Sequence, residues 1–173
     1  EASMFVLHGN DYDVVVHGHK TSSLVDFLND VLLKDTRESI AVYNMATGPR
    51  FAKRAAGAAT LDDVLGETHK DKVLPALERL LVGSMRAAVI LEYAESLAPA
   101  GDPAFQADAD RSAIIMLHRW SSLPAIEKGD NIILLVAENL SDLAPKIVSN
   151  PKVAVVDVPM PDRATRRAVA RIA

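Results

Sequence analysis

Two polar side chains follow apolar runs, at positions where a parallel sheet would carry chemistry. Glu92 follows a strand predicted over 86–91, and Asn139 lies two positions after a strand predicted over 131–137. Both runs are almost continuously apolar, which is typical of strands buried on both faces. Because ligands bind beyond the carboxyl ends of the strands in open parallel sheets, Glu92 and Asn139 are candidates for one site. The alternative, favoured for Glu92 and the nearby Glu95, is a pair of solvated carboxylates at the end of a strand.

Gly18, Lys20 and Thr21 form a second polar group, before the first expected helix. A lysine beside a hydroxyl is the pair that contacts phosphate and Mg²⁺ in phosphate-binding loops. In the same segment, His17 and His19 would place two imidazoles on one face of an extended chain, an arrangement that metal sites use. The sequence supplies no committed third ligand, so a solvated loop is the preferred interpretation of the two histidines.

The composition excludes several classes of protein. The 173 residues include no cysteine, which rules out disulfides, thiolate metal sites and a cysteine nucleophile. A net charge of −4 argues against a wholesale nucleic-acid binder. No serine lies in a G-x-S-x-G motif, and no apolar run is long enough to span a bilayer. The sequence therefore predicts a soluble, cytoplasmic protein with no membrane partner.

Short β-rich runs alternate with helical patterns, which is typical of a parallel α/β sheet. The predicted strands cover residues 5–8, 13–17, 39–45, 86–91, 131–137 and 153–158. The predicted helices cover residues 24–32, with Thr21 or Ser22 as the cap, and 60–65, 72–82, 111–121, 143–148 and 163–172. A surface loop is expected over 96–110. We expect one domain over 1–173, with residues 1–4 as a tag remnant or linker.

Basic residues gather in two places, and both are interpreted as solvated faces. The first group lies beside Phe51 and consists of Arg50, Lys53 and Arg54. The second group lies on the last helix, could also belong to a surface completed by sequence downstream, and consists of Arg163, Arg166, Arg167 and Arg171. His118, at the edge of the apolar face of helix 111–121, is interpreted as a partly buried structural histidine.

The order of these motifs resembles the core of an AAA+ ATPase module. Residues 88–92 stand where that family has its Walker B strand, and residues 132–139 resemble its sensor-1 strand, with Asn139 at the sensor position. Residues 155–162 are similar to the last strand and its exit towards the lid. The resemblance implies a three-layer αβα sandwich with a mainly parallel five-stranded sheet, P-loop NTPase-like, without the helical lid. Residues 163–173 would begin the connection to that lid or to a next module.

The family pattern is broken at the positions that carry its chemistry. A Walker A loop has the pattern G-x-x-x-x-G-K-[ST], of which this chain retains only Lys20 and Thr21, with His19 and Val14 at the two glycine positions. Glu92 stands in place of the Mg²⁺-binding Asp, and Tyr93 in place of the water-activating Glu. Residues 144–151 stand where related modules place arginine fingers, but they contain only a lysine, Lys146.

Two hypotheses on function follow from this resemblance. The preferred one is a non-catalytic AAA+-like domain that serves subunit contacts or partner docking, needs no cofactor, and reaches a homo-oligomer through a downstream AAA+ module of the same chain. The alternative is an active module that binds ATP with Gly18, Lys20 and Thr21, holds Mg²⁺ with Thr21 and Glu92, and orients water with Asn139. A third hypothesis, a receiver-like or flavodoxin-like binding domain, lacks the acidic cluster expected after the first strand.

Overall fold

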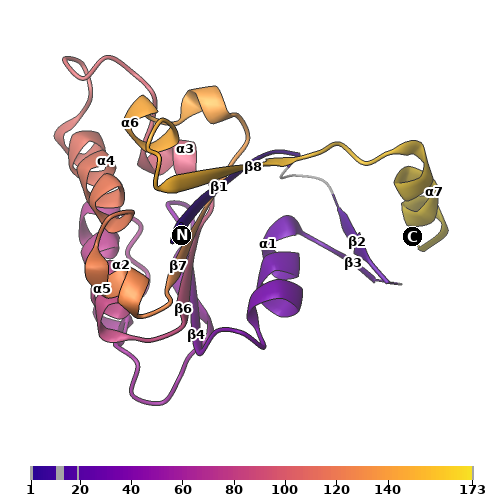
Figure 1. The fold of residues 1–173 in the computed structure, drawn as a ribbon, viewed down its shortest axis with the longest axis horizontal. Coiled ribbons are helices and arrows are strands. Elements are labelled where there is room, and N and C mark those ends of the chain that lie inside the picture. The colour runs from indigo at the N-terminus through magenta and orange to yellow at the C-terminus, as the bar shows by residue number, and fades with distance from the viewer. Residues whose placement is uncertain (1, 11–13, 19, 173) are drawn as a thin grey trace.

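Six strands form the central sheet of the computed structural model, which describes residues 2–10, 14–18 and 20–172 (Figure 1). Their spatial order is β5-β4-β6-β7-β1-β8, and every neighbouring pair is parallel except β4 with β5. β6 and β7 lie at the centre, which explains their apolar runs. The strands are β1 (Met4–Gly9), β4 (Ser39–Asn44), β5 (Gly48–Lys53), β6 (Ala87–Leu91), β7 (Ile132–Ala137) and β8 (Val153–Val158).

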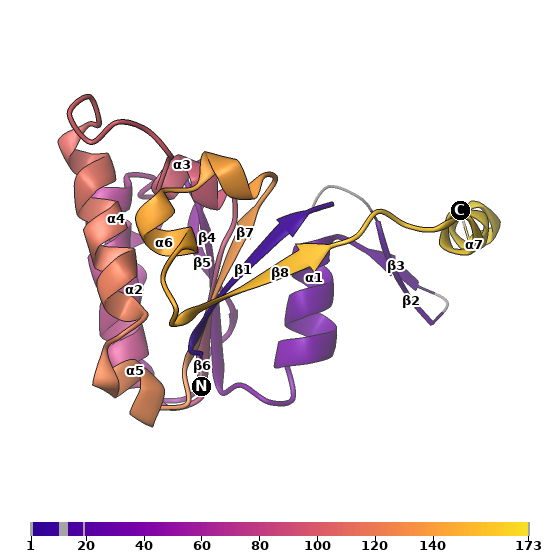
Figure 2. The same ribbon diagram turned by 45° about the horizontal axis from the view of Figure 1, so that its top comes forward.

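Helices cover both faces of the sheet, so the domain has three layers (Figures 1 and 2). One face carries α2 (Lys70–Gly83), α4 (Asp108–Trp120), α5 (Pro124–Lys128) and the short helices α3 (Ala94–Leu97) and α6 (Pro145–Val148). The other face carries α1 (Leu24–Phe27), which continues as the π-helical turn η1 (Leu28–Leu33). Each face buries its own apolar core, the larger one under α2 and α4 and the smaller one under α1.

β1 pairs with two strands from the C-terminal part of the chain, since β7 and β8 flank it on its two sides. Met4 opposes Ile133 in β7 and Val153 in β8. Met4, which the sequence grouped with the leading residues 1–4, is the first residue of β1 and is fully buried. The chain leaves β1 through α1 on one face and returns from β7 to β8 through α6 on the other.

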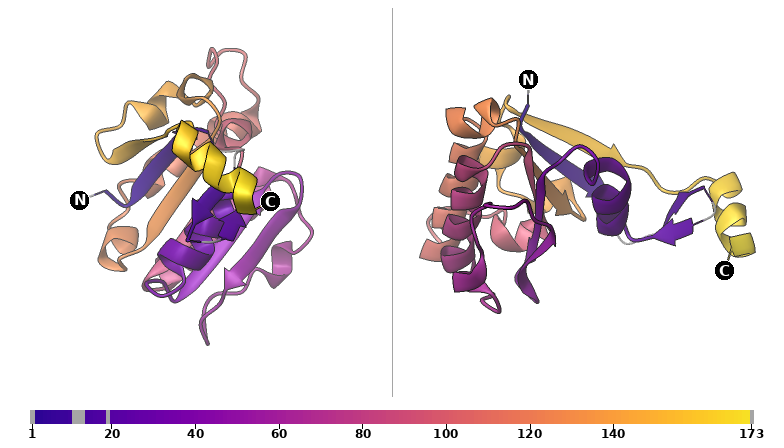
Figure 3. Two further views of the ribbon diagram at one scale, coloured as in Figure 1. Left: turned by 90° about the vertical axis from the view of Figure 1, so that its right-hand side faces the viewer. Right: turned by 90° about the horizontal axis from the view of Figure 1, so that it is seen from below.

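A small second sheet lies apart from the central one. β2 (Val15–His17) and β3 (Lys20–Ser22) pair as an antiparallel hairpin in the segment between β1 and α1. The last helix, α7 (Arg163–Ile172), packs beside this hairpin, and both extend away from the sheet (Figures 1 and 3). None of the described helices is both long enough and apolar enough to cross a membrane.

The predicted fold class, α/β with a mainly parallel sheet, is confirmed, but the sheet has one strand more than expected. The additional strand is β5, which the sequence suggested to be a turn followed by a solvated basic cluster. Pro49 has no N–H to donate, and an edge strand tolerates this because one side of its backbone needs no partner. The expected strand over 13–17 also differs, since its described residues belong to the hairpin and not to the central sheet; Asp13 lies outside the described residues.

Several helix boundaries were predicted wrongly. α4 begins at Asp108 and not at Arg111, and α3 forms at the start of the expected loop over 96–110. The expected helix over 60–65 is the 3₁₀ turn η2 (Asp62–Val64). The residue that caps α1 is Ser23, whose Oγ accepts a hydrogen bond from the Asp26 N–H, and not Thr21 or Ser22.

Candidate functional site

The carboxyl ends of the parallel strands meet at one edge of the sheet, and the polar residues after them define the candidate site. Asn44 ends β4, Glu92 follows β6, Asn10 follows β1, and Asn139 lies just beyond β7. The connections from β1 and from β7 leave on opposite faces, so the strand order reverses between these two strands. In open α/β sheets this reversal is where ligands bind.

The Glu92 carboxylate makes a hydrogen bond to a neighbouring strand of the sheet. Its Oε2 accepts a hydrogen bond of 2.8 Å from Asn44 Nδ2, and its backbone N–H donates to the Tyr43 carbonyl at 3.0 Å. The Asn44 Oδ1 in turn accepts from the backbone N–H groups of Ala46 and Thr47. The half-buried Glu92 carboxylate therefore orients the side chain that shapes the turn between β4 and β5.

Tyr93, directly after Glu92, has a strained backbone. Its φ of 53° lies in the left-handed region, which a bulky side chain rarely adopts. The Tyr93 carbonyl accepts hydrogen bonds from the N–H and the hydroxyl of Ser96, and these hold the turn into α3. No local signal in the sequence predicted this conformation. It fixes an exposed phenol, and not a second carboxylate, next to Glu92.

Asn139 lies near the end of β7 but points to a local partner. Its Nδ2 donates to Asp142 Oδ2 at 3.0 Å, across the 3₁₀ turn η3 (Leu140–Asp142). Asn139 is exposed, and among the described residues no hydrogen bond joins it to Glu92. The structure thus places both candidates at one edge of the sheet without joining them.

Gly18, Lys20 and Thr21 lie on the hairpin, far from Glu92. Lys20 opposes His17 and Thr21 opposes Val16 in the β2–β3 ladder, and Gly18 turns the chain with a φ of +60°. Figures 1 and 2 show this hairpin well away from the end of β6. The structure therefore does not bring Thr21 and Glu92 together as a pair of Mg²⁺ ligands.

The backbone immediately after β1 is occupied by its neighbours. The Gly9 N–H donates to the Glu138 carbonyl and the Asn10 N–H to the Val158 carbonyl, each at 3.0 Å. Gly9 has a φ of +109°, and a Cβ there would lie 2.8 Å from the Val158 carbonyl oxygen. A phosphate-binding loop needs free N–H groups at this place, and these two are already used.

The N-terminus of α1 is also unsuited to an anion. The Ser23 hydroxyl accepts from the Asp26 N–H at 3.1 Å and donates to the Asp26 carboxylate at 2.8 Å. The hydroxyl thus occupies the Asp26 N–H, which an anion would otherwise use, and the Asp26 carboxylate adds a negative charge to the first turn. A phosphate bound here would meet that carboxylate, which opposes the favourable end of the helix dipole.

The other side chains predicted from the sequence have structural roles. Lys53 Nζ donates to the carbonyls of Lys34 and Arg37, both at 2.6 Å, and the Arg54 guanidinium lies 5.3 Å from the centre of the Phe51 ring. No metal-binding group of three or more side chains occurs among the described residues, and His19 lies outside them. His118 is half-buried, as predicted.

Two titratable groups near the β4–β5 turn have shifted pKa values. Burial raises the pKa of the Tyr43 phenol, whose hydroxyl donates to the Thr68 carbonyl at 2.8 Å. A hydrogen bond from Lys72, and then hydrogen bonds from the backbone and side chain of His69, lower the pKa of Glu67 to about 2. Among the described residues, no hydrogen bond or ion pair joins the Tyr43 phenol or the Glu67 carboxylate to Glu92 or Asn139, so these shifts lie outside the candidate site.

Comparison with solved structures finds a similar fold in a chain of the HORMA:CdnC:Trip13 complex of E. coli MS115-1, with a TM-score of 0.61. The two chains are 16% identical, so the likeness concerns the fold alone. The match covers 98% of this chain and 52% of the other, so this chain spans about half the length of its neighbour. No curated protein sequence matches the chain.

Comparison with protein families links the chain to a known group of proteins. The family described as "AAA+ chaperone, N-terminal Rossmann-like domain" matches residues 1–159. This range contains the complete central sheet, from β1 to β8, and all the helices that cover it. The chain therefore belongs to the family of AAA+ chaperone N-terminal Rossmann-like domains.

Proposed function

We propose that this chain is a non-catalytic domain of an AAA+ chaperone, and that it serves subunit contacts or partner docking. The observation that carries the proposal is the β2–β3 hairpin, which contains Lys20 and Thr21 and lies in the chain between β1 and α1. A phosphate cradle requires successive N–H groups that converge on one point. An antiparallel ladder instead directs its N–H groups alternately to its two sides. The backbone that carries Lys20 and Thr21 therefore does not have the conformation of a phosphate-binding loop.

Two further features support the absence of nucleotide chemistry. The N–H groups of Gly9 and Asn10 bind neighbouring carbonyls, and Asp26 carries a negative charge where the phosphates would approach α1. Glu92 binds Asn44, and the residue after it is Tyr93 in place of a second acid. A domain with these features needs neither ATP nor Mg²⁺.

Calorimetric titration of the 173-residue chain with Mg·ATP tests the proposal. We expect no binding tighter than millimolar, in the parent chain and in the variant Lys20→Ala alike. Lys128→Ala is the matched control, because Lys128 is an exposed lysine at the end of α5 and does not line the pocket that contains Lys20 and Thr21. Micromolar binding that Lys20→Ala abolishes and Lys128→Ala preserves would overturn the proposal and establish the active module with an atypical loop.

The proposal assigns ATP hydrolysis to a downstream AAA+ module of the same chain, in the cytoplasm, and any homo-oligomer to contacts made by that module. The reading frame beyond residue 173 should then encode complete Walker A and Walker B motifs. A downstream sequence without those motifs would contradict this part of the proposal, whatever the titration shows.

A further inference from the structure

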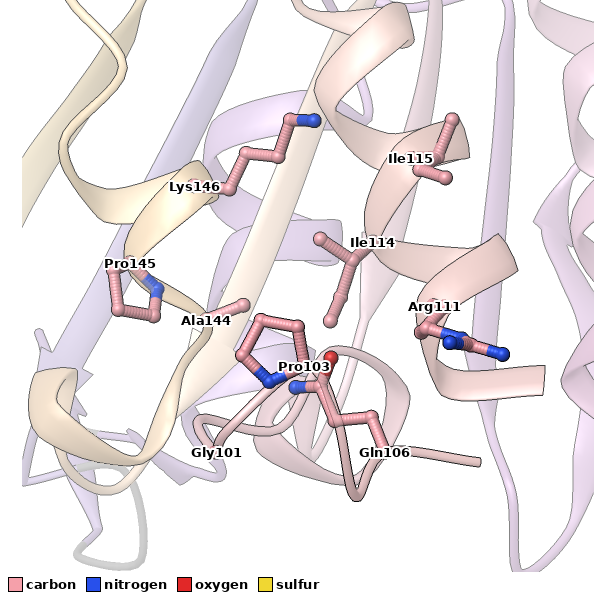
Figure 4. Close-up of a pocket in the computed structure, with 9 residues that line it drawn as sticks. All are labelled: Gly101, Pro103, Gln106, Arg111, Ile114, Ile115, Ala144, Pro145 and Lys146. Atoms are coloured by element: carbon pink, nitrogen blue, oxygen red, sulfur yellow. The ribbon is translucent and has the colours of Figure 1, made fainter. Parts of the chain in front are cut away.

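A groove of about 350 Å³ lies between α4 and α6, on the helical face of the sheet (Figure 4). The loop over 99–107 closes one end of it. Ile114 of α4 and Ala144 and Pro145 at the start of α6 supply apolar lining, with Pro103 from the loop. The volume is at the low end of the range of roughly 300–1,000 Å³ for ligand pockets. It suits a large side chain with its backbone better than a whole cofactor.

The walls of the groove are held in place by hydrogen bonds. The Ala144 N–H donates to the Ala98 carbonyl at 2.9 Å, and the Ala100 N–H donates to the Asp142 carbonyl at 2.7 Å. Pro99 and Leu143 form an isolated antiparallel bridge between the same two segments. The loop and α6 are thus tied together before any ligand arrives, which lowers the entropy lost on binding.

The charges on the rim are of one sign. Lys146 on α6 and Arg111 on α4 line the groove, and no carboxylate is among its lining residues in the described part of the chain. Arg111 pairs with the exposed Asp108 through one nitrogen, Nη2, and such surface pairs contribute little. Lys146 makes no ion pair among the described residues. In a chain with net charge −4, this local excess of positive charge favours an acidic ligand.

Gln106 supplies an acceptor inside the apolar lining. Its Nε2 donates to the Pro99 carbonyl at 3.0 Å, which fixes the orientation of the carboxamide. The other atom, Oε1, then faces the groove, and Figure 4 shows it turned towards Ile114. A backbone N–H is the donor that a peptide would offer to it. This feature favours a polypeptide over a lipid, whose apolar chains carry no donor.

We propose that this groove docks a segment of a partner protein in which large apolar side chains are flanked by carboxylates. An apolar side chain fills the space beside Ile114, the carboxylates meet Lys146 and Arg111, and a backbone N–H donates to Gln106. Two exposed apolar side chains close by, Ile115 on the rim and Phe105 on the loop, are 58% and 88% exposed and extend the surface that such a segment would cover. The proposal rests on the docking role proposed above and does not depend on whether the chain binds nucleotide.

Fluorescence anisotropy with labelled peptides tests this proposal on the 173-residue chain. The probes are three short peptides with the same pair of central leucines, flanked by glutamates, by glutamines or by lysines. We expect micromolar binding of the glutamate peptide and at least tenfold weaker binding of the other two. Equal binding of all three peptides, or no binding of the glutamate peptide below millimolar, would overturn the proposal and leave the ATP titration as an independent result.

Variants on the rim locate the binding site. Lys146→Glu and Ile115→Asp should each weaken binding of the glutamate peptide at least tenfold, and Lys146→Glu should improve binding of the lysine peptide. The matched controls are Lys128→Glu and Val82→Asp, since both residues are exposed and lie outside the groove. Binding that the rim variants leave unchanged would contradict the proposal. So would self-association of the chain that Ile115→Asp abolishes, because a second copy would then be the occupant.

Discussion

At the scale of single residues, two asparagines of this fold differ in burial and in the number of hydrogen bonds that their side chains make. Asn131 is almost fully buried, and its side chain accepts from the Ala87 N–H at 2.6 Å and donates to the carbonyls of Leu81 and Ser84 at 2.6 and 2.8 Å. It joins the end of α2 to the starts of β6 and β7. Asn139 is exposed and makes one local hydrogen bond, to Asp142.

Replacing Asn131 should therefore destabilise the fold strongly. Asn131→Ala leaves a buried N–H and a buried carbonyl without partners, and each costs about 1–3 kcal/mol. We expect a loss of roughly 2–6 kcal/mol in the free energy of unfolding, measured by urea denaturation. Asn139→Ala is the control and should change stability by less than about 0.5 kcal/mol. Equal effects of the two substitutions would show that the Asn131 contacts are not maintained in solution.

Glu67 should give the fold a pH dependence in acid. Its pKa is lowered to about 2 in the folded chain, whereas an unfolded glutamate titrates near about 4.3. The stabilisation is thus complete above about pH 4.3 and is lost as the pH falls towards 2. A carbon-13 NMR titration of the Glu67 carboxyl should show this low midpoint, and Lys72→Met should raise it while Lys128→Met should not. A midpoint near 4.3 in the parent chain would refute the contact with Lys72.

The residues of the candidate site could be predicted only in part. Glu92 and Asn139 follow apolar runs, and that pattern placed both correctly at the carboxyl ends of strands. The partner of Glu92, Asn44, could not be predicted, since their contact depends on β4 lying next to β6. The interpretation of Lys20 and Thr21 as a phosphate-binding pair is weakened for a similar reason. The types of two adjacent residues do not determine the conformation of their backbone, which is that of a β-hairpin.

At the scale of elements, Lys70 ties three helices together. This first residue of α2 is 5% exposed, and its Nζ donates to the carbonyls of Ser96 and Leu97, at the end of α3, at 2.9 Å each. It also pairs with Asp110 in the first turn of α4. The carbonyl groups of the short helix α3 thus find their partner in a neighbouring helix.

Breaking this pair, in which the lysine is buried and the carboxylate half-buried, should loosen the helical layer. Lys70→Met should cost about 2–4 kcal/mol in the free energy of unfolding, because the Ser96 and Leu97 carbonyls lose their donor and the Asp110 carboxylate loses its partner. In the double variant Lys70→Met/Asp110→Leu the loss should be smaller than the sum of the single losses by about 0.5–3 kcal/mol. Urea denaturation of the four chains measures this coupling. Strictly additive losses would mean that the ion pair contributes nothing.

Elements with regular apolar spacing were predicted well, and elements at the edges were not. The face of α4 formed by Ala113, Ile114, Leu117 and Trp120 is buried as its spacing predicts. β5 was missed because Pro49 and the exposed Arg50 break the alternation expected of a strand. The strand predicted over 13–17 contains β2, but its pairing with β3 was not predicted, because the three residues of β3 are too few to show a period.

At the scale of the whole molecule, the last helix and the last strand differ in their importance for folding. A chain that ends after residue 160 lacks α7, whose main packing partners are the two strands of the hairpin. It should unfold cooperatively with a free energy within about 1 kcal/mol of the parent, because the central sheet and both apolar cores remain complete. Thermal unfolding followed by circular dichroism measures this.

A chain that ends after residue 150 should behave differently, since it lacks β8. β1 then loses its parallel partner on one side, and the Asn10 N–H loses its acceptor, Val158. We expect no cooperative transition and a poorly dispersed amide NMR spectrum. A cooperative transition in this shorter chain would show that five strands suffice.

The position of β1 between β7 and β8 also governs how the protein emerges from the ribosome. Met4 finds its partners only at Ile133 and Val153, so the first strand to be synthesised is among the last to be paired. At about 5–20 residues per second, β1 waits for roughly 7–30 s with its apolar side chains uncovered. β4 and β5, joined by a tight turn, can meet almost as soon as they are made. Slowing translation would therefore lengthen the exposure of β1 and leave the β4–β5 pair unaffected.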